Sequence, residues 1–477
     1  MLKVVHPSTH TQEREYALRV VLRDWLGLEY VTERGDADSV QITRVEDPAR
    51  GKLQVSDVFL ATREDQWLAK ASLPTEVRPW APSLDGVPSP LALLFGDKLD
   101  NDDYLMVEPG LVRLGVDVFG TAFFMLSRYE EVVNGERDEF GRFAGRFSVL
   151  HSAGLVARPI VNEHVELLWW ALHRLWPDLV RRPRTYRCLL SCDVDNISVM
   201  GVSPWRALRI VVGRSVRDAL REGPWYGTPH RAWQLWQAWR GHAGVDDLDD
   251  FDFLMEQAEH VGCRMTFNVI AGHGRSGRDG VYHVGSGAIR KLMRRIHDRG
   301  HEIGFHGSYD TFLDPRRLRQ EFTRLKRIAA EEGVTQAQWG GRQHYLRWAA
   351  PTTWQAYEDA GLAVDSSLGY ADHAGFRCGT CYEFPAFNLL TREALKLRER
   401  PLIVMEGSLF KSAYMGLTSP QAVEKVAALS QACREFGGEF TLLWHNGQTQ
   451  DPEMRETFLQ MLQLAAATGA IHAGAGA

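Results

Sequence analysis

The chain has 477 residues, of which 44% are hydrophobic and 24% are charged, a balance typical of globular proteins; the length predicts two or three domains. The formal net charge is −6 and basic and acidic residues are interspersed, so charge gives no indication of nucleic acid as a partner. Six cysteines are too sparse in a chain of this length for a disulfide framework.

Signals for export or membrane insertion are missing from the sequence pattern. The N-terminal stretch MLKVVHPSTHTQEREYALRVV lacks a basic segment followed by an apolar core and a cleavage site, so we expect no secretion signal. No apolar run is long enough to cross a bilayer, and we therefore expect a cytoplasmic protein. Cys378 and Cys381 form one CxxC, whereas a zinc ribbon needs two such pairs. We interpret them as packed thiols, with a redox role as the alternative.

The first part of the chain, residues 1–184, is predicted to be a smaller mixed α/β domain. Apolar residues recur there at helical spacing; Tyr16, Val20 and Trp25, for example, share one helix face. The spacing predicts helices at residues 11–25, 119–131 and 161–175. No segment has the spacing of a catalytic motif, so we expect a structural or substrate-gating role.

From Tyr186 onward, short apolar strands alternate with amphipathic helices, the pattern of a β/α architecture. Strands are predicted at residues 186–192, 264–270, 301–305, 337–341, near 362, 402–405 and 439–444. Helices are predicted at residues 286–300, through Trp354 to Gly361, through Val423 to Phe436, and through Met454 to Leu462. We therefore predict a distorted β/α barrel over residues 185–477, with a helical insertion at about 197–250.

Within that insertion, residues 205–221 predict an amphipathic helix whose arginines lie largely off its apolar face. The apolar face consists of Trp205, Leu208, Val211, Val212, Ala219 and Leu220. A basic amphipathic helix can lie in a membrane interface, which would make the protein peripheral to a membrane. The alternative, which ordinary amphipathic packing favours, is a helix packed on the barrel with solvated arginines.

Polar side chains follow the carboxyl ends of successive predicted strands. They are Asp193 and Asp195, His306 and Asp310, Arg342 and His344, Asp365, Glu406, and His445. In β/α barrels catalytic groups collect at this face because the strand ends converge there. One polar residue after a strand is usually a cap or a loop residue, but a succession of strands that end this way favours an active site.

Three segments resemble the polysaccharide deacetylases, the NodB homology group. They are Asp193-Val194-Asp195 after a strand, His301-Glu302-Ile303-Gly304-Phe305-His306, and Leu443-Trp444-His445. The resemblance covers residues 187–470 and implies a metal-dependent deacetylase on a distorted β/α barrel. It implies Asp193 as the general base, Asp195 and His306 as metal ligands, Arg342 as the residue that orients the base, and Leu443 and His445 as the pocket leucine and the histidine acid.

Asp310 stands where the family has its second metal histidine, at the same interval from His306. Because a carboxylate oxygen also ligates zinc, we predict Asp195, His306 and Asp310 as the metal ligands. This more anionic set would shift the preference towards manganese. The alternative is that Asp310 only caps the helical segment that follows it. His344 replaces a proline that the family usually has two residues after the arginine.

The expected cofactor is a divalent metal, zinc first, with manganese, cobalt or nickel as alternatives. The candidate substrate contacts are Leu443, Trp444, His344, Arg377 and Glu406. Trp444 would stack on a sugar ring, although core packing is the commoner fate of tryptophan. Arg377 would contact substrate or pair with an acid, and Glu406 is the best remaining acid for a supporting role beside the site.

These residue types supply the parts of metal-dependent amide hydrolysis. A metal polarises the carbonyl and acidifies water, a free carboxylate takes the proton, and a histidine protonates the leaving amine. We predict a hydrolase that removes acetyl groups, N-acetyl first and O-acetyl as the alternative, from a glycan or a glycan precursor, for example in surface polysaccharide biosynthesis. The competing hypotheses are a non-catalytic carbohydrate-binding relative and a glycoside hydrolase that uses Asp193 and Glu406 as opposed carboxylates.

Overall fold

The computed structural model describes residues 1–195, 247–274, 276–280 and 282–466. The predicted helix at 205–221 and nearly all of the predicted insertion lie outside these ranges. Within the described ranges, no helix has the length and the apolar character needed to span a membrane.

The first part of the chain is a mixed α/β unit. Its strands are β1 (Leu2–Pro7), β2 (Tyr30–Gly35), β3 (Ser39–Arg44), β4 (Lys52–Ser56), β5 (Arg78–Trp80), β6 (Leu91–Leu93), β7 (Leu105–Glu108) and β8 (Leu111–Leu114). Its α-helices are α1 (Thr11–Leu18), α2 (Val118–Leu126), α3 (Tyr129–Val133), α4 (Val149–Ser152) and α5 (Ile160–Leu175). Shorter turns are η1 (Arg19–Trp25, π-helical), η2 (Phe59–Ala61), η3 (Lys70–Ser72) and η4 (Gly145–Phe147).

A six-stranded sheet of order β2-β1-β3-β4-β8-β7 organises this unit, with parallel pairs β1–β2 and β4–β8. Burial alternates along β1 and β4, as expected for strands with one covered face. The predicted helix at 11–25 is confirmed as α1 and η1, and the one at 161–175 as α5. The predicted helix at 119–131 is broken into α2 and α3 because Arg128 has a left-handed φ of 56°.

The second part begins at Arg187 and alternates strands with helices. Its strands are β9 (Arg187–Val194), β10 (Met265–Ile270), β11 (Glu302–Gly307), β12 (Gly340–Gln343), β13 (Val364–Asp365), β14 (Phe384–Asn388), β15 (Glu393–Glu399), β16 (Val404–Met405) and β17 (Glu439–Leu443). Its α-helices are α8 (Asp247–His260), α9 (Gly287–Asp298), α10 (Pro315–Glu331), α11 (Thr352–Ala360), α12 (Glu406–Phe410), α13 (Ser419–Glu435) and α14 (Pro452–Ala466). Short turns are η5 (Thr311–Leu313), η6 (His344–Leu346) and η7 (Asn446–Gln450).

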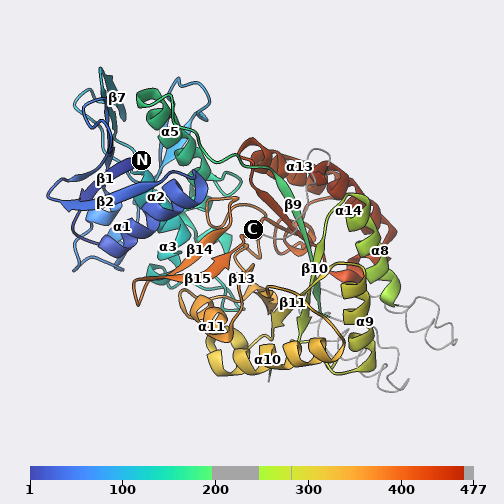
Figure 1. The fold of residues 1–477 in the computed structure, drawn as a ribbon. Coiled ribbons are helices and arrows are strands. Elements are labelled where there is room, and N and C mark those ends of the chain that lie inside the picture. The colour runs from blue at the N-terminus through green and yellow to red at the C-terminus, as the bar shows by residue number, and fades with distance from the viewer. Residues whose placement is uncertain (196–246, 275, 281, 467–477) are drawn as a thin grey trace.

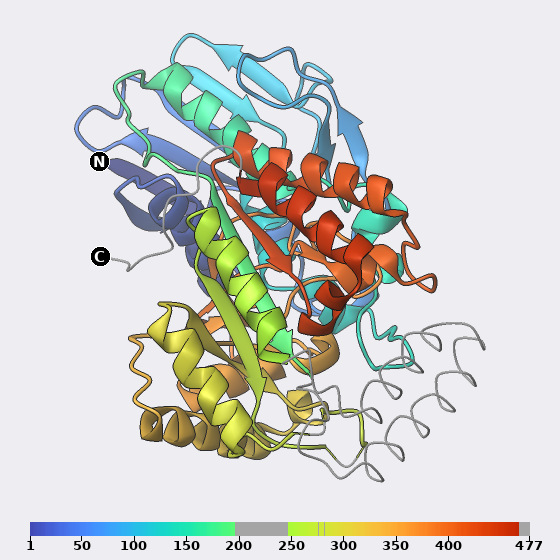
Figure 2. The ribbon, with the colours of Figure 1, turned by 90° about the vertical axis from the view of Figure 1, so that its right-hand side faces the viewer.

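These strands form one curled nine-stranded sheet of order β14-β15-β13-β12-β11-β10-β9-β17-β16. Every neighbouring pair is parallel except β14–β15, a hairpin that the sequence reasoning missed. Helices α8, α9 and α10 lie along the outer side of the sheet, and α13 and α14 lie beside β9 and β17 (Figure 2). In the part of the chain that the structure describes, β14 and β16 are the sheet's two edges, so the curl is consistent with the predicted distorted barrel.

Local signals explain several element boundaries. Asp314 accepts a hydrogen bond from the amide of Arg317 (3.0 Å) and thereby starts α10, with Pro315 in the first turn. Gly361, with a φ of 87°, ends α11, as the sequence predicts. The strand predicted at 337–341 begins later, as β12, where the bare backbone of Gly341 lies against the Phe305 carbonyl.

The β14–β15 hairpin lies between the two parts of the molecule (Figure 1). The hydroxyl of Tyr16 donates to the carbonyl of Pro385 (2.6 Å), and Phe123 packs edge-on against Phe387. Farther along, Glu131 forms a bidentate ion pair with Arg377, with a shortest distance of 2.6 Å. Both apolar and charged side chains therefore join the two parts.

The six cysteines are all buried free thiols. Cys378 and Cys381 are fully enclosed, and burial raises the pKa of the Cys378 thiol. A buried, protonated thiol is a poor nucleophile, which favours the interpretation of this CxxC as packed thiols.

Candidate active site

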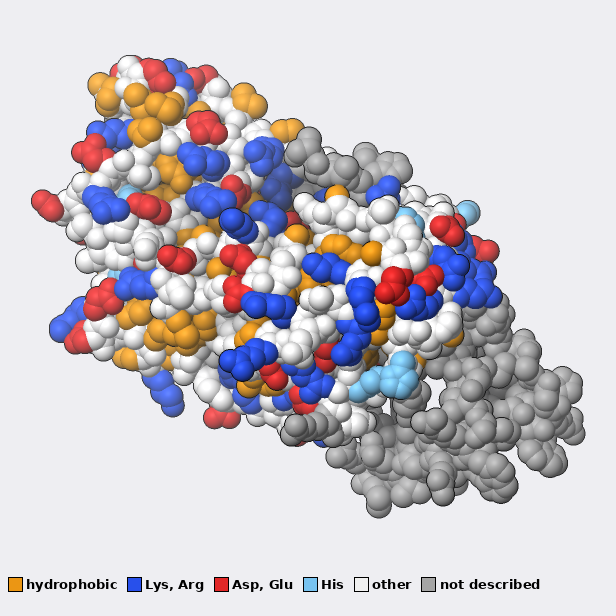
Figure 3. Space-filling view, turned by 60° about the horizontal axis from the view of Figure 1, so that its bottom comes forward, with side chains coloured by type: hydrophobic (Ala, Val, Ile, Leu, Met, Phe, Trp, Pro, Cys, Tyr) orange, Lys and Arg blue, Asp and Glu red, His pale blue; other side chains and the backbone are white. Residues whose placement is uncertain are grey.

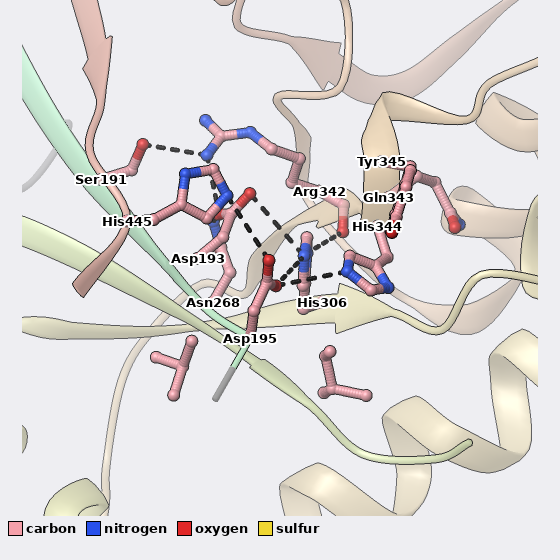
Figure 4. Close-up of polar contacts among 12 residues, drawn as sticks. Ser191, Asp193, Asp195, Asn268, His306, Arg342, Gln343, His344, Tyr345 and His445 are labelled. Atoms are coloured by element: carbon pink, nitrogen blue, oxygen red, sulfur yellow. Dashed lines mark hydrogen bonds and ion pairs between the residues drawn. The ribbon is translucent and has the colours of Figure 1, made fainter. Parts of the chain in front are cut away.

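Strand register brings the polar strand ends together. Asn268 of β10 lies opposite Asp193 of β9, and Arg342 of β12 lies opposite His306 of β11. Asp195 follows Asp193 on the same face, because side chains two residues apart in an extended chain point the same way. His445 follows β17, the neighbour of β9 on its other side. The site thus spans five adjacent strands, and its side chains converge (Figure 4).

A group able to hold a metal ion consists of Asp195, His306 and His344. Oδ1 of Asp195 lies 3.4 Å from Nε2 of His306 and 3.4 Å from Nε2 of His344. This oxygen is buried and has no hydrogen-bond partner in the described structure. One carboxylate oxygen and two imidazole nitrogens therefore face a common point.

The outer nitrogens of both imidazoles determine which atoms face that point. Nδ1 of His306 lies 2.9 Å from the carbonyl oxygen of Arg342, and Nδ1 of His344 lies 2.8 Å from a carboxylate oxygen of Asp279. Because each of these partners only accepts, each Nδ1 must carry a proton and donate it. In a neutral ring this leaves the Nε2 lone pair directed at Asp195, the arrangement typical of metal-ligating histidines.

These donors fit a divalent cation. The Nε2 lone pairs of His306 and His344 and the carboxylate of Asp195 repel one another unless a cation or a proton lies between them. Burial alone would lower the pKa of His344, but Asp195 and Asp279 raise it to about 9. Without a metal, a proton on His344 compensates Asp195; a metal ion would replace that proton, as is usual for histidine ligands.

Asp193 lies beside this group with its two oxygens in different settings. Its Oδ1 accepts hydrogen bonds from Asn268 (2.7 Å) and from the guanidinium of Arg342 (2.9 Å), while Oδ2 faces Nε2 of His306 at 3.7 Å. Burial would raise the pKa of Asp193, but Arg342 and His306 hold it below the ordinary value. The carboxylate is therefore charged, anchored through one oxygen, and has the other directed at the metal-capable group.

His445 lies beside the other carboxylate oxygen of Asp195. Its Nε2 lies 3.6 Å from Oδ2 of Asp195, and its Nδ1 lies 2.5 Å from Oε1 of Glu406. Burial would lower the pKa of His445, but Glu406 and Asp195 raise it to about 10. The imidazole is thus a proton-bearing group beside Asp195, directly after the strand that neighbours β9.

Asp310, predicted as the third metal ligand, is not part of the group able to hold a metal ion. His344 takes its place beside Asp195 and His306. The turn between His306 and Asp310 is fixed by Glu321, which binds the amide and hydroxyl of Ser308, and by Asp279, which accepts from the amide of Tyr309. This path carries the Asp310 carboxylate to Arg347, 3.8 Å from its guanidinium. The alternative role is also not seen, because Asp310 makes no capping hydrogen bond to η5.

The other predicted substrate contacts are placed as follows. Arg377 is 1% exposed and pairs with Glu131, which is the structural role considered for it. Trp444 is fully buried between Phe410 and Phe458, and Leu443 is equally buried. Glu406 supports His445, and His344 belongs to the metal-capable group.

Three supporting residues escaped the sequence reasoning. Asn268 and Ser191 bind Asp193 and the Arg342 guanidinium, respectively, and each is a buried polar residue within a largely apolar strand, a signal that could have been used. Asp279 has no such signal, because it lies in an irregular segment that carries neither periodicity nor a motif. Its role emerges only from the fold.

Comparison with known proteins gives limited information. The model of a family described as a family of unknown function (DUF7033) matches residues 2–177. No curated protein matches the chain.

Solved structures with similarity include two polysaccharide deacetylases and an allantoinase. A protein described as a polysaccharide deacetylase from Mycobacterium smegmatis has a TM-score of 0.38 and 19% identity over 61% of this chain and 86% of its own. Another, from Pseudomonas aeruginosa PAO1, has a TM-score of 0.33 and 16% identity over 46% and 67%. Puue allantoinase has a TM-score of 0.35 and 11% identity over 60% and 88%.

Proposed function

We propose that this protein is a metal-dependent hydrolase that removes acetyl groups, N-acetyl groups first, from a glycan or a glycan precursor. One observation carries the proposal: Asp195, His306 and His344 direct three donor atoms at one point, and Oδ2 of Asp193 and Nε2 of His445 lie beside that group. The motifs around Asp193, His306 and His445 that resemble polysaccharide deacetylases support the same reaction class.

The ligand set of this proposal is Asp195, His306 and His344. A divalent cation bound there would polarise the acyl carbonyl and acidify a water molecule. One carboxylate and two imidazoles suit zinc, with cobalt, nickel and manganese as the other candidates. The replacement of Asp310 by His344 makes the set less anionic than the sequence predicts, and this removes the argument for manganese.

The proton donors and acceptors follow from the hydrogen bonds of the site. Asp193 accepts a proton from water through Oδ2, while Arg342 and Asn268 hold its other oxygen in place. His445 donates a proton to the leaving amine from Nε2, because its Nδ1 is engaged by Glu406. Asp193 is thus the base and His445 the acid, the two proton-transfer roles that hydrolysis of an amide requires.

The glycoside hydrolase alternative is less consistent with these contacts. Glu406 would have to act as one of two opposed carboxylates, but its Oε1 is held 2.5 Å from His445. A non-catalytic carbohydrate-binding protein would need neither the Arg342–Asp193 pair nor the Glu406–His445 pair. We therefore retain the deacetylase as the proposal.

Acetate release tests this proposal directly. The metal-loaded full chain is assayed on N-acetyl sugar nucleotides and N-acetylated oligosaccharides, with and without a chelator. We expect chelator-sensitive acetate release from at least one substrate and a loss of roughly 10²–10⁴-fold in Asp193→Asn, the range of a missing general base. The Asp193→Asn protein should keep its metal, because Asp193 is not a ligand. Wild-type activity in Asp193→Asn would reject the assigned role.

A further inference from the structure

Tyr345, an exposed aromatic residue, directly follows His344, one of the three residues able to hold a metal ion. Tyr345 is 36% exposed, and its ring lies 4.7 Å from that of His344, centroid to centroid. Its φ of 62° places a non-glycine residue in the left-handed region, which is costly and persists only where the surroundings impose it. Arg142 contributes to this by donating to the Tyr345 carbonyl (3.2 Å). The fold therefore holds this ring beside His344, where it is partly exposed.

Two further rings flank Tyr345, and an arginine lies over both. Phe140 and Tyr309 lie 5.5 Å and 5.2 Å from the Tyr345 ring. The guanidinium carbon of Arg278 is 5.1 Å from the Phe140 centroid and 5.0 Å from that of Tyr309. We call Phe140, Arg278, Tyr309 and Tyr345 the aromatic rim. Phe140 comes from the first part of the chain, so both parts contribute to it.

The neighbouring Arg142 and Arg347 have hydrogen-bond partners, whereas the guanidinium of Arg278 has none among the described residues. Arg142 binds the carboxylate of Asp138 (2.7 Å), and Arg347 donates to the carbonyls of Phe140 and Tyr309. Among the residues that the structure describes, the guanidinium of Arg278 has no hydrogen bond and no carboxylate partner. Its charge is partly exposed and its donors are available to a ligand.

The position of Arg278 is tied to that of the metal-capable group by the next residue. Asp279 accepts from the ring of His344 and from the backbone amide of Tyr309. One short segment therefore orients a ligand histidine, places one rim ring and presents the unpaired guanidinium. Such rigid coupling suits a group that positions substrate relative to the reacting bond.

We propose that Arg278 binds an oxyanion of the substrate, a phosphate or a carboxylate, while the sugar ring packs on Tyr345. This deepens the proposed function and rests on it, because it makes the substrate an acetylated saccharide that carries negative charge. A guanidinium matches the geometry of either oxyanion with two parallel hydrogen bonds. Aromatic faces beside it supply the flat apolar surface on which a sugar ring packs.

Binding of matched saccharides tests the proposal without requiring turnover. N-acetylglucosamine, its 1-phosphate and the corresponding uronic acid are titrated calorimetrically into metal-loaded full-length protein. Arg278→Gln is compared with Arg319→Gln, since Arg319 is an exposed arginine of α10 with no ion pair to a described residue. We expect an anionic form to bind roughly 10–100-fold more tightly than the neutral sugar, the range of a charged hydrogen bond.

That advantage should disappear in Arg278→Gln, persist in Arg319→Gln and shrink as ionic strength rises. The phosphate and the uronate arms identify which oxyanion is recognised. Equal affinity for neutral and anionic sugars in the wild-type protein, or an advantage that survives Arg278→Gln, would overturn the proposal. Arg278-dependent binding without acetate release from any substrate would instead reject the deacetylase assignment and leave the anion site standing.

Discussion

Asp193 and Asp195 are two residues apart, yet the structure gives them different chemistry. Arg342 and Asn268 hold one oxygen of Asp193, whereas Oδ1 of Asp195 has no hydrogen bond to the described residues and faces two imidazoles. The difference arises from neighbouring strands: β10 and β12 provide the groups that bind Asp193, and β11 and η6 provide the histidines. Two acids that are neighbours in sequence thus have different surroundings, as the proposed roles of base and metal ligand require.

The acid role proposed for His445 predicts a specific pH dependence. Asp193 must be deprotonated and its pKa is below the ordinary value, while His445 must be protonated and its pKa is raised to about 10. Activity should therefore rise through an acidic limb, stay level, and fall as pH increases through about 10.

Glu406→Gln should shift only the alkaline limb. Removing the carboxylate that most strongly raises the His445 pKa lets that pKa fall, so activity is lost at lower pH than in the wild type. Measuring kcat/KM against pH at saturating metal checks this. An alkaline limb that stays in place in Glu406→Gln would show that His445 is not the group that titrates there.

The sequence locates most of the site's residues but not all their roles. Asp193, Asp195, His306, Arg342 and His445 can be found because each follows a recognisable strand. The ligand role proposed for His344 could not, because it depends on the left-handed backbone at Tyr345 and on Asp279, which lies far away in sequence. The spacing from His306 to Asp310 suggests Asp310 rather than His344, because spacing alone does not fix the path of a turn.

At the level of elements, a buried charge cluster connects α3 with the segment that precedes β14. Glu131 is 1% exposed and binds the guanidinium groups of both Arg128 and Arg377. Burial would raise the pKa of Glu131, but Arg377 and Arg128 hold it below the ordinary value. The stabilisation from this carboxylate is therefore present above its unfolded pKa and is lost as pH falls through the folded one.

Glu131→Gln should lower the free energy of unfolding by about 3–5 kcal/mol, because it leaves two buried guanidinium groups without a carboxylate. Denaturant unfolding at neutral pH measures this. Glu166→Gln is the matched control: its partner Arg181 is 40% exposed, and the loss should stay below about 1 kcal/mol. Equal losses in the two variants would contradict the importance assigned to the buried cluster.

Strand and helix positions in the second part were largely predictable, since short apolar runs and helical periodicity alternate there. The β14–β15 hairpin was not, because its residues Phe384–Asn388 are buried by contact with the first part of the chain rather than by a pattern of their own. The break at Arg128 was also hidden, because apolar spacing continues across it.

On the scale of the whole molecule, the two parts share enough contacts to unfold together. Trp25 packs against Tyr382, Phe123 against Phe387, and Glu131 pairs with Arg377, so separation would expose aromatic surface and a buried charge. We therefore expect one calorimetric transition for the full chain, with equal calorimetric and van't Hoff enthalpies. Two well-separated transitions would show that residues 1–184 and the barrel fold independently.

Basic and acidic side chains are interspersed on the face shown in Figure 3, as they are along the sequence. The surface charge there has no dominant sign, so the proposed recognition of a charged substrate would depend on individual groups such as Arg278. The location of the protein and any contact of residues 205–221 with a membrane remain predictions from the sequence.

Metal content in matched variants tests the central claim most directly, that Asp195, His306 and His344 hold a catalytic divalent ion. Wild-type, His344→Ala and Asp310→Ala proteins are loaded with zinc, dialysed and analysed for bound metal, with circular dichroism as a check of folding. We predict one zinc ion per chain in the wild type and in Asp310→Ala, and severe loss in His344→Ala. Full retention in His344→Ala together with loss in Asp310→Ala would contradict this ligand set.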